Sequence, residues 1–392
     1  LLGLGTVGGA VARGLLEHGE WLAAATGGRP IYLVAVGVRD PDRPRAVSIP
    51  RGIVRSADLA AVAADAGVDV VVELLGGLEP AGELIATALT SGRSVVTANK
   101  ALLARQGVDL EARARRSGAS LRFEAAVGGG IPVLAPLAAD LAANRWTTVG
   151  GILNGTTNFI LTAMTEAGFG YETALAEAQA QGYAEADPSG DVEGRDAADK
   201  VALLARLAFG AWPDVEAIRR APPAVEGDAA PGIGGVTAAA IAAAAELELV
   251  IKLVGRATRG AGDEVAAAVL PMVVPAASAL GRTGGVDNLV ELEGEPIGRI
   301  RISGPGAGAE ATSSAVLGDL VAIARGLGST WAGLPSASAA GPLADPLAGE
   351  RRWFHLLPDG GAALTEPAGL EAVRAELRAN GIGGALYPFV EA

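Results

Sequence analysis

Short hydrophobic runs alternate with helical patterns along the first third of the chain. Five runs have the length of buried parallel strands, at residues 1–4, 31–38, 68–75, 94–97 and 121–127. The apolar spacing of helices lies between these runs, at residues 58–66, 79–91 and 101–117. This alternation predicts a parallel, doubly wound α/β domain at residues 1–130. The chain begins within the first run and without a methionine, so we expect residues to precede it.

The pattern changes after residue 130. Helical patterns recur at residues 131–144, 157–165, 171–181 and 195–209, and strand patterns at 150–153, 265–274 and 288–302. These elements predict an α+β domain at residues 131–303. A helix at 311–324 follows a glycine-rich segment, and we expect residues 304–326 to complete the first domain.

The remaining residues have a different composition. Residues 327–350 end in a stretch rich in alanine, proline, glycine and serine, which predicts a linker. Residues 351–392 predict a short extension with one strand, a helix at 369–380 and a second strand.

Composition excludes several classes of function. Half of the 392 residues are hydrophobic, which is typical of an ordered protein with two or three domains. The net charge of −13 disfavours a nucleic-acid partner. The chain has no cysteine and only two histidines, His18 and His355, so disulfides, thiolate chemistry and multi-histidine metal sites are not expected.

No segment predicts a membrane span. The most apolar uncharged stretch, residues 229–245, contains Pro231 and several glycines, so we expect a loop followed by an alanine-rich helix. With no visible secretory signal, the composition favours a cytoplasmic protein.

A G-x-G-x-x-G motif, formed by Gly3, Gly5 and Gly8, joins the first strand to the first helix. In a Rossmann domain the first glycine makes the turn, the second lets the backbone approach a pyrophosphate, and the third allows close helix packing. The helix N-terminus then presents free N–H groups to the phosphates. The position of the motif therefore favours NAD(P) binding over an ordinary turn among 56 glycines.

Charged residues follow the second predicted strand. An acid such as Asp40 would bind the ribose of NAD, whereas Arg39, Arg43 or Arg45 would bind the 2′-phosphate of NADP. We favour NADP slightly because three arginines cluster here, although a solvated charged loop explains any one of them equally well. Lys100 follows the fourth strand, at the sheet edge where ligands bind, and is either a site residue or a surface lysine.

Asp196 and Lys200 are four residues apart on one helix face. Leu203 and Leu207 continue this face, so we expect it to point toward protein. An ion pair on an inward face is costly unless it is used. The pair therefore predicts an active site.

Two further segments carry polar groups. Glu124 precedes several small residues whose carbonyl groups suit a hard cation, although the residues alone favour a hinge between domains. Residues 154–158 (Asn-Gly-Thr-Thr-Asn) predict a helix N-cap, which is compatible with a substrate-facing loop.

Together these residues resemble the homoserine dehydrogenase family over residues 1–326. The most specific match is the order of Gly, Asp, Pro and Lys at residues 182–200. The other matches are the glycine motif, the Glu124 loop and residues 73–77, 97–100, 151–161 and 304–319. The resemblance implies a dinucleotide-binding domain, a dimerisation region and a substrate domain. It also implies NAD(P)-dependent interconversion of L-homoserine and L-aspartate 4-semialdehyde, on the route to threonine, methionine and isoleucine.

The resemblance assigns roles to individual residues. Lys200 would be the general acid/base and Lys100 a second lysine for proton transfer or cofactor contact, while Glu185, Asp191 and Asp196 would bind substrate. Cofactor contacts would come from Gly3, Gly5, Thr6, Val7, Gly8, Arg39, Gly76, Lys100, Gly182 and Gly308. A sodium ion would bind the Glu124 carboxylate and the carbonyls of Val127, Gly129 and Ile131. The family further implies a homodimer with a small-molecule substrate.

The chain departs from the family pattern in two places. Residues 19–30 lengthen the gap before the second strand, which shifts the expected cofactor-preference residues by a few positions. Residues 351–392 are too few for the amino-acid-binding ACT domain of many bacterial members, so we expect no intact threonine-sensing module and interpret the segment as a candidate remnant. Two alternative functions remain: another NAD(P)-dependent amino-acid reductase, such as one acting on an imine, and a non-catalytic NAD(P) sensor.

Overall fold

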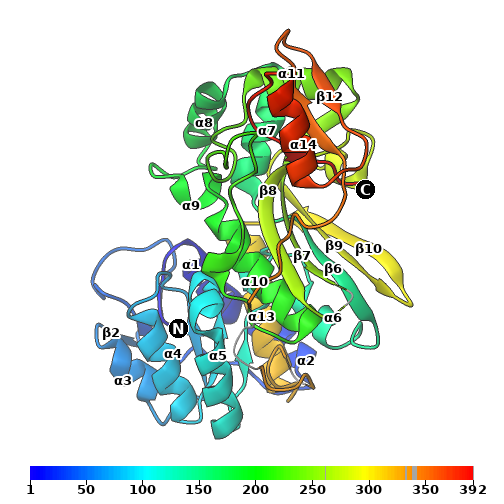
Figure 1. The fold of residues 1–392 in the computed structure, drawn as a ribbon. Coiled ribbons are helices and arrows are strands. Elements are labelled where there is room, and N and C mark those ends of the chain that lie inside the picture. The colour runs from blue at the N-terminus through cyan, green and yellow to red at the C-terminus, as the bar shows by residue number, and fades with distance from the viewer. Residues whose placement is uncertain (261, 332, 338–341, 392) are drawn as a thin grey trace. The chain divides into compact units, whose positions relative to one another are not determined.

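The computed structural model describes residues 1–260, 262–331, 333–337 and 342–391. The chain forms two compact units (Figure 1). Unit 1 consists of Leu1–Asn144, Leu203–Trp212 and Pro305–Ala340, and unit 2 of Arg145–Ala202, Pro213–Gly304 and Gly341–Ala392. The predicted linker includes residues 332 and 338–341, which lie outside the described residues.

Unit 1 contains a parallel sheet of short strands. These are β1 (Ala35–Gly37), β2 (Val54–Ser56), β3 (Val70–Glu73), β4 (Ser94–Thr97) and β5 (Leu121–Arg122). Leu2 bridges Gly37 and Glu73 in parallel, so it joins the pair β1–β2 to the order β3-β4-β5. The predicted parallel α/β fold is confirmed.

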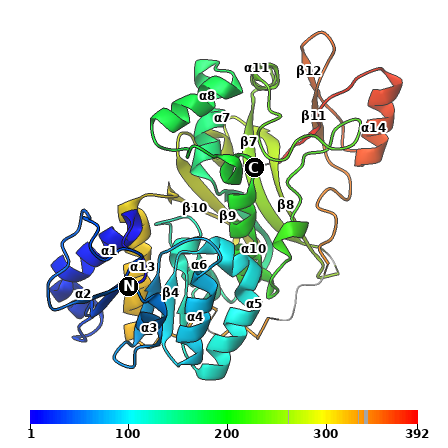
Figure 2. The same ribbon diagram turned by 90° about the vertical axis from the view of Figure 1, so that its left-hand side faces the viewer.

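Helices cover this sheet. They are α1 (Thr6–Glu17), α2 (Gly19–Ala25), α3 (Leu59–Ala64), α4 (Ala81–Thr90), α5 (Lys100–Ser117), the 3₁₀ turn η1 (Glu124–Ala126), α6 (Leu134–Ala138) and α13 (Ala309–Ala324). Figure 2 shows α4 and α5 side by side next to β4. Helix α13 packs on α1, and its Val316 and Leu320 share a core with Val11 and Val72.

Several sequence predictions for unit 1 differ from the structure. The strand predicted at 31–38 is confined to β1, and the helix predicted at 131–144 to α6. Residues 19–25 of the supposed insertion form α2. Strand β2 was missed because it is a three-residue edge strand with no buried side chain and therefore no apolar alternation.

Unit 2 is built on a five-stranded sheet in the order β10-β9-β6-β7-β8. Its strands are β6 (Arg145–Ile152), β7 (Leu249–Arg259), β8 (Val265–Pro275), β9 (Asp287–Glu295) and β10 (Gly298–Pro305). The β6–β7, β6–β9 and β7–β8 pairs are antiparallel. The segment predicted as strand at 288–302 is two strands, and β7 was not predicted.

The helices of unit 2 include the one that carries Lys200. They are α7 (Gly155–Ala167), α8 (Tyr171–Ala180), α9 (Ser189–Val192), α10 (Arg195–Phe209), α11 (Ala238–Glu246) and α12 (Ala279–Arg282), with the 3₁₀ turn η2 (Val215–Ala217). Helix α10 begins in unit 2 and ends in unit 1. No helix in the described part of the chain has both the length and the apolar character of a membrane span.

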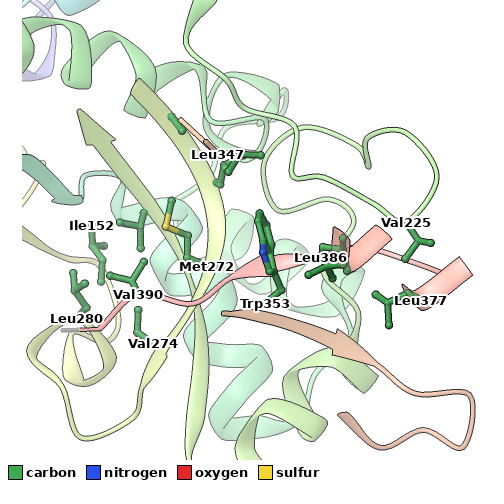
Figure 3. Packing of buried hydrophobic residues seen from close by; sticks show 14 of the residues in the cluster. Ile152, Val225, Met272, Val274, Leu280, Leu347, Trp353, Leu377, Leu386 and Val390 are labelled. Carbon is green, nitrogen blue, oxygen red and sulfur yellow. The ribbon is translucent and has the colours of Figure 1, made fainter. Parts of the chain in front are cut away.

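The C-terminal segment belongs to the core of unit 2. It contains β11 (Trp353–Leu356), β12 (Ala362–Leu364), α14 (Leu370–Ala379) and β13 (Tyr387–Pro388), one strand more than predicted. The Val390 N–H donates to the Val273 carbonyl of β8. Trp353 and Leu386 share one hydrophobic cluster with Met272 (Figure 3). The segment is therefore packed into the larger sheet's core.

Candidate active site

The glycine motif forms a tight turn before α1. Gly3 has a φ of +94°, and a Cβ there would lie 2.6 Å from the Leu74 carbonyl oxygen. A Cβ on Gly8 would lie 2.2 Å from the Gly3 oxygen, so both positions require glycine. A Cβ on Gly5 would have no described atom within 4 Å. The middle glycine thus faces open space where a pyrophosphate would approach the N-terminus of α1.

A cavity of about 900 Å³ opens at this turn. The residues that line it include four that the sequence predicted for a cofactor site, namely Gly3, Gly5, Thr6 and Arg39. The Asp40 side chain also lines it, but its Oδ1 accepts the backbone N–H groups of Asp42 and Arg43, both at 3.1 Å. This acid is therefore engaged in its own loop.

Sequence reasoning missed a polar network at the ends of β3 and β4. The Glu73 side chain is fully buried, and its Oε1 accepts the N–H of Leu75 at 2.7 Å and of Gly76 at 3.2 Å. Its Oε2 accepts the Thr97 hydroxyl at 2.6 Å. The network holds the loop that contains Gly76 to the strand that leads to Lys100.

Asn99 connects that loop to the helix of Lys100. Its amide donates to the Gly77 carbonyl at 2.7 Å, and its Oδ1 caps α5 by accepting the Leu102 N–H at 3.2 Å. Lys100 is the first residue of α5 and is half-buried. Capping by Asn99 therefore fixes the backbone of Lys100 at the carboxyl edge of the sheet.

Glu124 lies in a buried loop of unit 1. Its Oε1 accepts the N–H groups of Val133 and Leu134 at 2.6 and 2.8 Å, and its Oε2 that of Ala135 at 2.7 Å. Burial raises the pKa of Glu124, although the three N–H donors favour its charged form.

The same loop contains backbone carbonyl groups that receive no hydrogen bond from any residue that the structure describes. In the described residues no donor is hydrogen-bonded to the carbonyls of Val127, Gly129 or Ile131, all in buried residues. Oε2 of Glu124 accepts one donor and so keeps acceptor capacity. Carbonyl and carboxylate oxygens without donors are the type of ligand that a hard cation prefers. No group of three or more His, Cys, Asp or Glu suited to a metal occurs in the part of the chain described.

The predicted Asp196–Lys200 pair is present in unit 2. Asp196 Oδ2 lies 2.8 Å from Lys200 Nζ, and Lys200 is 7% exposed. The Lys200 ammonium also donates to the Leu153 carbonyl at 2.5 Å. Leu203 is fully buried on the same helix, so the inward face is confirmed.

Asn154 joins the two neighbouring acids. Its Nδ2 donates to Asp191 Oδ1 at 2.7 Å and to Asp196 Oδ2 at 2.9 Å, while its Oδ1 caps α7 at the Thr157 N–H. The predicted N-cap is therefore confirmed. Burial, and then the Asp196 charge, raise the pKa of Asp191.

Family models for homoserine dehydrogenase match two blocks of the chain. The model of the homoserine dehydrogenase NAD-binding domain matches residues 3–124, and the homoserine dehydrogenase model matches residues 132–321. A homoserine dehydrogenase of Synechocystis sp. is 42% identical over 350 residues, covering 88% of this chain and 76% of the relative. The chain belongs to the homoserine dehydrogenase family. The Mycobacterium tuberculosis homoserine dehydrogenase is 44% identical over 329 residues, covering 83% and 71%.

Solved structures of homoserine dehydrogenases have the same fold. The structure from Thiobacillus denitrificans matches with a TM-score of 0.88 at 33% identity, and the match covers 100% of this chain and 97% of the other chain. That from S. aureus at pH 7.5 has a TM-score of 0.77 at 30% identity, with coverages of 99% and 97%. The chain is thus an NAD(P)-dependent oxidoreductase that interconverts L-homoserine and L-aspartate 4-semialdehyde in amino-acid biosynthesis. The two alternative functions are not favoured.

The structure brings only some of the predicted homoserine dehydrogenase residues together. Asp191, Asp196 and Lys200 form one cluster in unit 2. Glu185 has an exposed side chain, and Gly182 has a φ of +76° after α8. Sequence reasoning missed Leu153 and Asn288, whose Nδ2 donates to the Leu153 carbonyl at 3.0 Å. No local spacing relates residues 153 and 288, because only the β6–β9 pairing brings them close.

The remaining predicted cofactor residues lie in unit 1. Val7 and Gly8 are in the first turns of α1, and Gly76 follows β3 in the loop held by Glu73. Gly308 is the N-cap of α13, with a φ of +116°, and it precedes Ala309, which lines the 900 Å³ cavity.

Proposed function

We propose that Lys200 is the general acid/base of homoserine oxidation. Two of the three N–H bonds of its ammonium are taken by Asp196 and the Leu153 carbonyl, which supports a third directed at the substrate oxygen. NAD(P)⁺, when bound, would supply the hydride acceptor for the C4 hydrogen. The neutral Lys200 amine takes the hydroxyl proton as the C–O single bond becomes the aldehyde double bond, and the ammonium returns it in the reverse direction.

We propose that the acids around Lys200 bind the amino-acid part of the substrate. Asp191 and Asp196, joined by Asn154, suit the substrate ammonium, and the exposed Glu185 would close on it when substrate binds. Lys100 is proposed as the second site lysine and Gly182 as a backbone contact to the cofactor. The assignments of Glu185, Lys100 and Gly182 rest on the family resemblance.

The proposed role of Lys200 rests on its buried contacts with Asp196 and Leu153, and the Lys200→Ala variant tests this role. Loss of a general acid/base reduces turnover by roughly 10²- to 10⁴-fold, so the variant should lose homoserine-dependent NADP⁺ reduction by that factor. Arg195→Ala removes an exposed cation from the same helix and serves as the control. Near-normal turnover in Lys200→Ala would remove Lys200 from the mechanism.

We propose a preference for NADP. Arg39 lines the 900 Å³ cavity while the Asp40 carboxylate is engaged by its own loop, which supports a 2′-phosphate rather than a free ribose hydroxyl. Arg39→Ala should raise the KM for NADP⁺ and leave the KM for NAD⁺ unchanged, with Arg55→Ala on the neighbouring strand as control. Equal effects on both cofactors would contradict the assignment.

We further propose a bound sodium ion and a homodimer in the cytoplasm. Glu124 and the carbonyls of Val127, Gly129 and Ile131 would hold the ion, which would brace the loop that leads into α6. Sodium should raise the thermal stability of the parent and not of Glu124→Gln, whereas equal responses would reject the site.

Light scattering tests the proposed homodimer, and a monomer mass at working concentration would exclude it. The biosynthetic role supports the cytoplasmic location.

A further inference from the structure

The Leu153 carbonyl receives two hydrogen bonds at once. Lys200 Nζ donates to it at 2.5 Å and Asn288 Nδ2 at 3.0 Å. A carbonyl oxygen has two lone pairs, so both are occupied. Leu153 directly follows β6 and Asn288 is the second residue of β9, and the pairing of these two strands fixes both groups.

Asn288 is held in one orientation at a cost. The residue is fully buried, and its Oδ1 has no hydrogen-bond partner among the described residues. Turning the amide over would place Oδ1 against the Leu153 oxygen, so the donor must face the carbonyl. A buried unpaired acceptor is destabilising, and apolar residues of similar shape avoid that penalty. A role in the neighbouring Lys200 site would explain why a buried asparagine occupies this position.

We propose that Asn288 is a positioning residue for Lys200, acting through the Leu153 carbonyl. This inference rests on the proposed role of Lys200. By occupying one lone pair, the Asn288 amide confines the ammonium to the other and so fixes the direction of its remaining N–H. The amide also withdraws electron density from the shared oxygen, which weakens its hold on the ammonium and eases release of the proton.

The charged groups near Lys200 are separate from Asn288, so a substitution at Asn288 leaves them in place. Asp196 on α10 pairs with the ammonium, and Asp191 on α9 interacts with it electrostatically. The groups from β9 and the residue after β6 are neutral, namely the Asn288 amide and the Leu153 carbonyl. A change at Asn288 should therefore alter the pH dependence of turnover without removing a charge.

Two substitutions separate positioning from folding. Asn288→Leu removes the donor at similar volume, and homoserine kcat should fall about tenfold, the equivalent of one lost hydrogen bond, while the KM for NADP⁺ stays constant. Its pH profile of homoserine oxidation should move to higher pH, because the carbonyl then holds the ammonium more tightly. Asn288→Asp is isosteric and adds a negative charge, so its profile should move up by about one pH unit or more.

The control is Leu292→Ala on the same strand. Leu292 is fully buried, so its truncation lowers stability without touching the Leu153 carbonyl. If Asn288→Leu and Asn288→Asp keep the parent pH profile, with kcat reduced no more than in Leu292→Ala, the inference is overturned. Should Asn288→Leu not fold, the pH shift of Asn288→Asp decides alone. Full turnover in Lys200→Ala would instead contradict the role of Lys200 itself.

Discussion

Lys252 is a buried lysine in a chain that is rich in arginine. The chain contains three lysines, Lys100, Lys200 and Lys252, and its other basic side chains apart from the two histidines are arginines. Lys252 is 4% exposed on β7. Its Nζ donates to Asn158 Oδ1 at 3.0 Å and to the Thr283 carbonyl at 2.7 Å. Burial lowers its pKa to about 8, because desolvation outweighs the opposing effect of the Glu166 charge.

This residue predicts how stability depends on pH. The unfolded chain has the ordinary lysine pKa of 10.5, so between pH 8 and 10.5 it binds more protons than the folded chain. The free energy of unfolding should therefore rise with pH, by roughly 2 kcal/mol from pH 7.5 to 9.5. Urea unfolding at both pH values measures it, and Lys252→Met should lose the rise. Tyr387, whose pKa burial raises to about 12, acts in the opposite sense only above pH 10.

How far the sequence predicts the site depends on the distance along the chain. The Asp196–Lys200 pair was predicted because residues four apart share a helix face. The Glu73–Thr97 contact and the Asn288–Leu153 contact were not predicted, because their partners are 24 and 135 residues apart. Contacts of that kind depend on strand pairing, which local patterns do not encode.

At the scale of elements, predictions held where one physical pattern dominated. Strand β4 was predicted at its observed bounds because three of its four residues are buried. Strand β7 was missed because Lys252, Gly255 and Arg256 interrupt its apolar residues. The structure accommodates them individually, with Arg256 pairing to Glu291 at 3.1 Å and Gly255 allowing Val201 of α10 to approach.

The turn before α1 predicts opposite outcomes for two similar substitutions. Gly8→Ala should lower the melting temperature, because its Cβ would lie 2.2 Å from the Gly3 oxygen. Gly5→Ala should leave stability within about 0.5 kcal/mol and weaken NAD(P)⁺ binding at least tenfold, because its Cβ would enter the open space expected to hold the pyrophosphate. Thermal unfolding and fluorescence titration measure the two effects. Equal stability losses would mean that Gly5 is also a packing residue.

The C-terminal segment predicts a loss of stability in unit 2 when its core contact is removed. Trp353 is fully buried among residues of β8 and α14 (Figure 3). Trp353→Ala should reduce the free energy of unfolding by about 3–5 kcal/mol, as for other buried aromatic truncations. Chemical unfolding measures this, with the exposed Trp21→Ala as control. A loss below about 1 kcal/mol would mean that the segment folds independently of the sheet.

At the scale of the whole molecule, α10 is one continuous helix shared by both units. Residues Arg195–Ala202 belong to unit 2 with Lys200, and Leu203–Phe209 belong to unit 1. In unit 1, the fully buried Arg206 donates to Glu111 through Nε at 3.0 Å and Nη2 at 2.7 Å. Trp212 also donates to Glu111, at 2.9 Å. The far end of the helix that carries Lys200 is thus anchored by a buried ion pair.

This anchor predicts cooperative unfolding that one substitution disrupts. Because melting of either unit would fray α10, calorimetry should give a single transition that NAD(P)⁺ shifts as a whole. Glu111→Gln leaves the Arg206 charge buried and unpaired, which should cost about 3–5 kcal/mol and separate the transition into two. Asp109→Asn breaks an exposed pair with Arg113 on the same helix and should change stability by less than about 1 kcal/mol. Since Glu111 lies outside the proposed catalytic residues, kcat at low temperature should stay near normal in both variants. Two separate transitions in the parent chain would show that α10 does not couple the units.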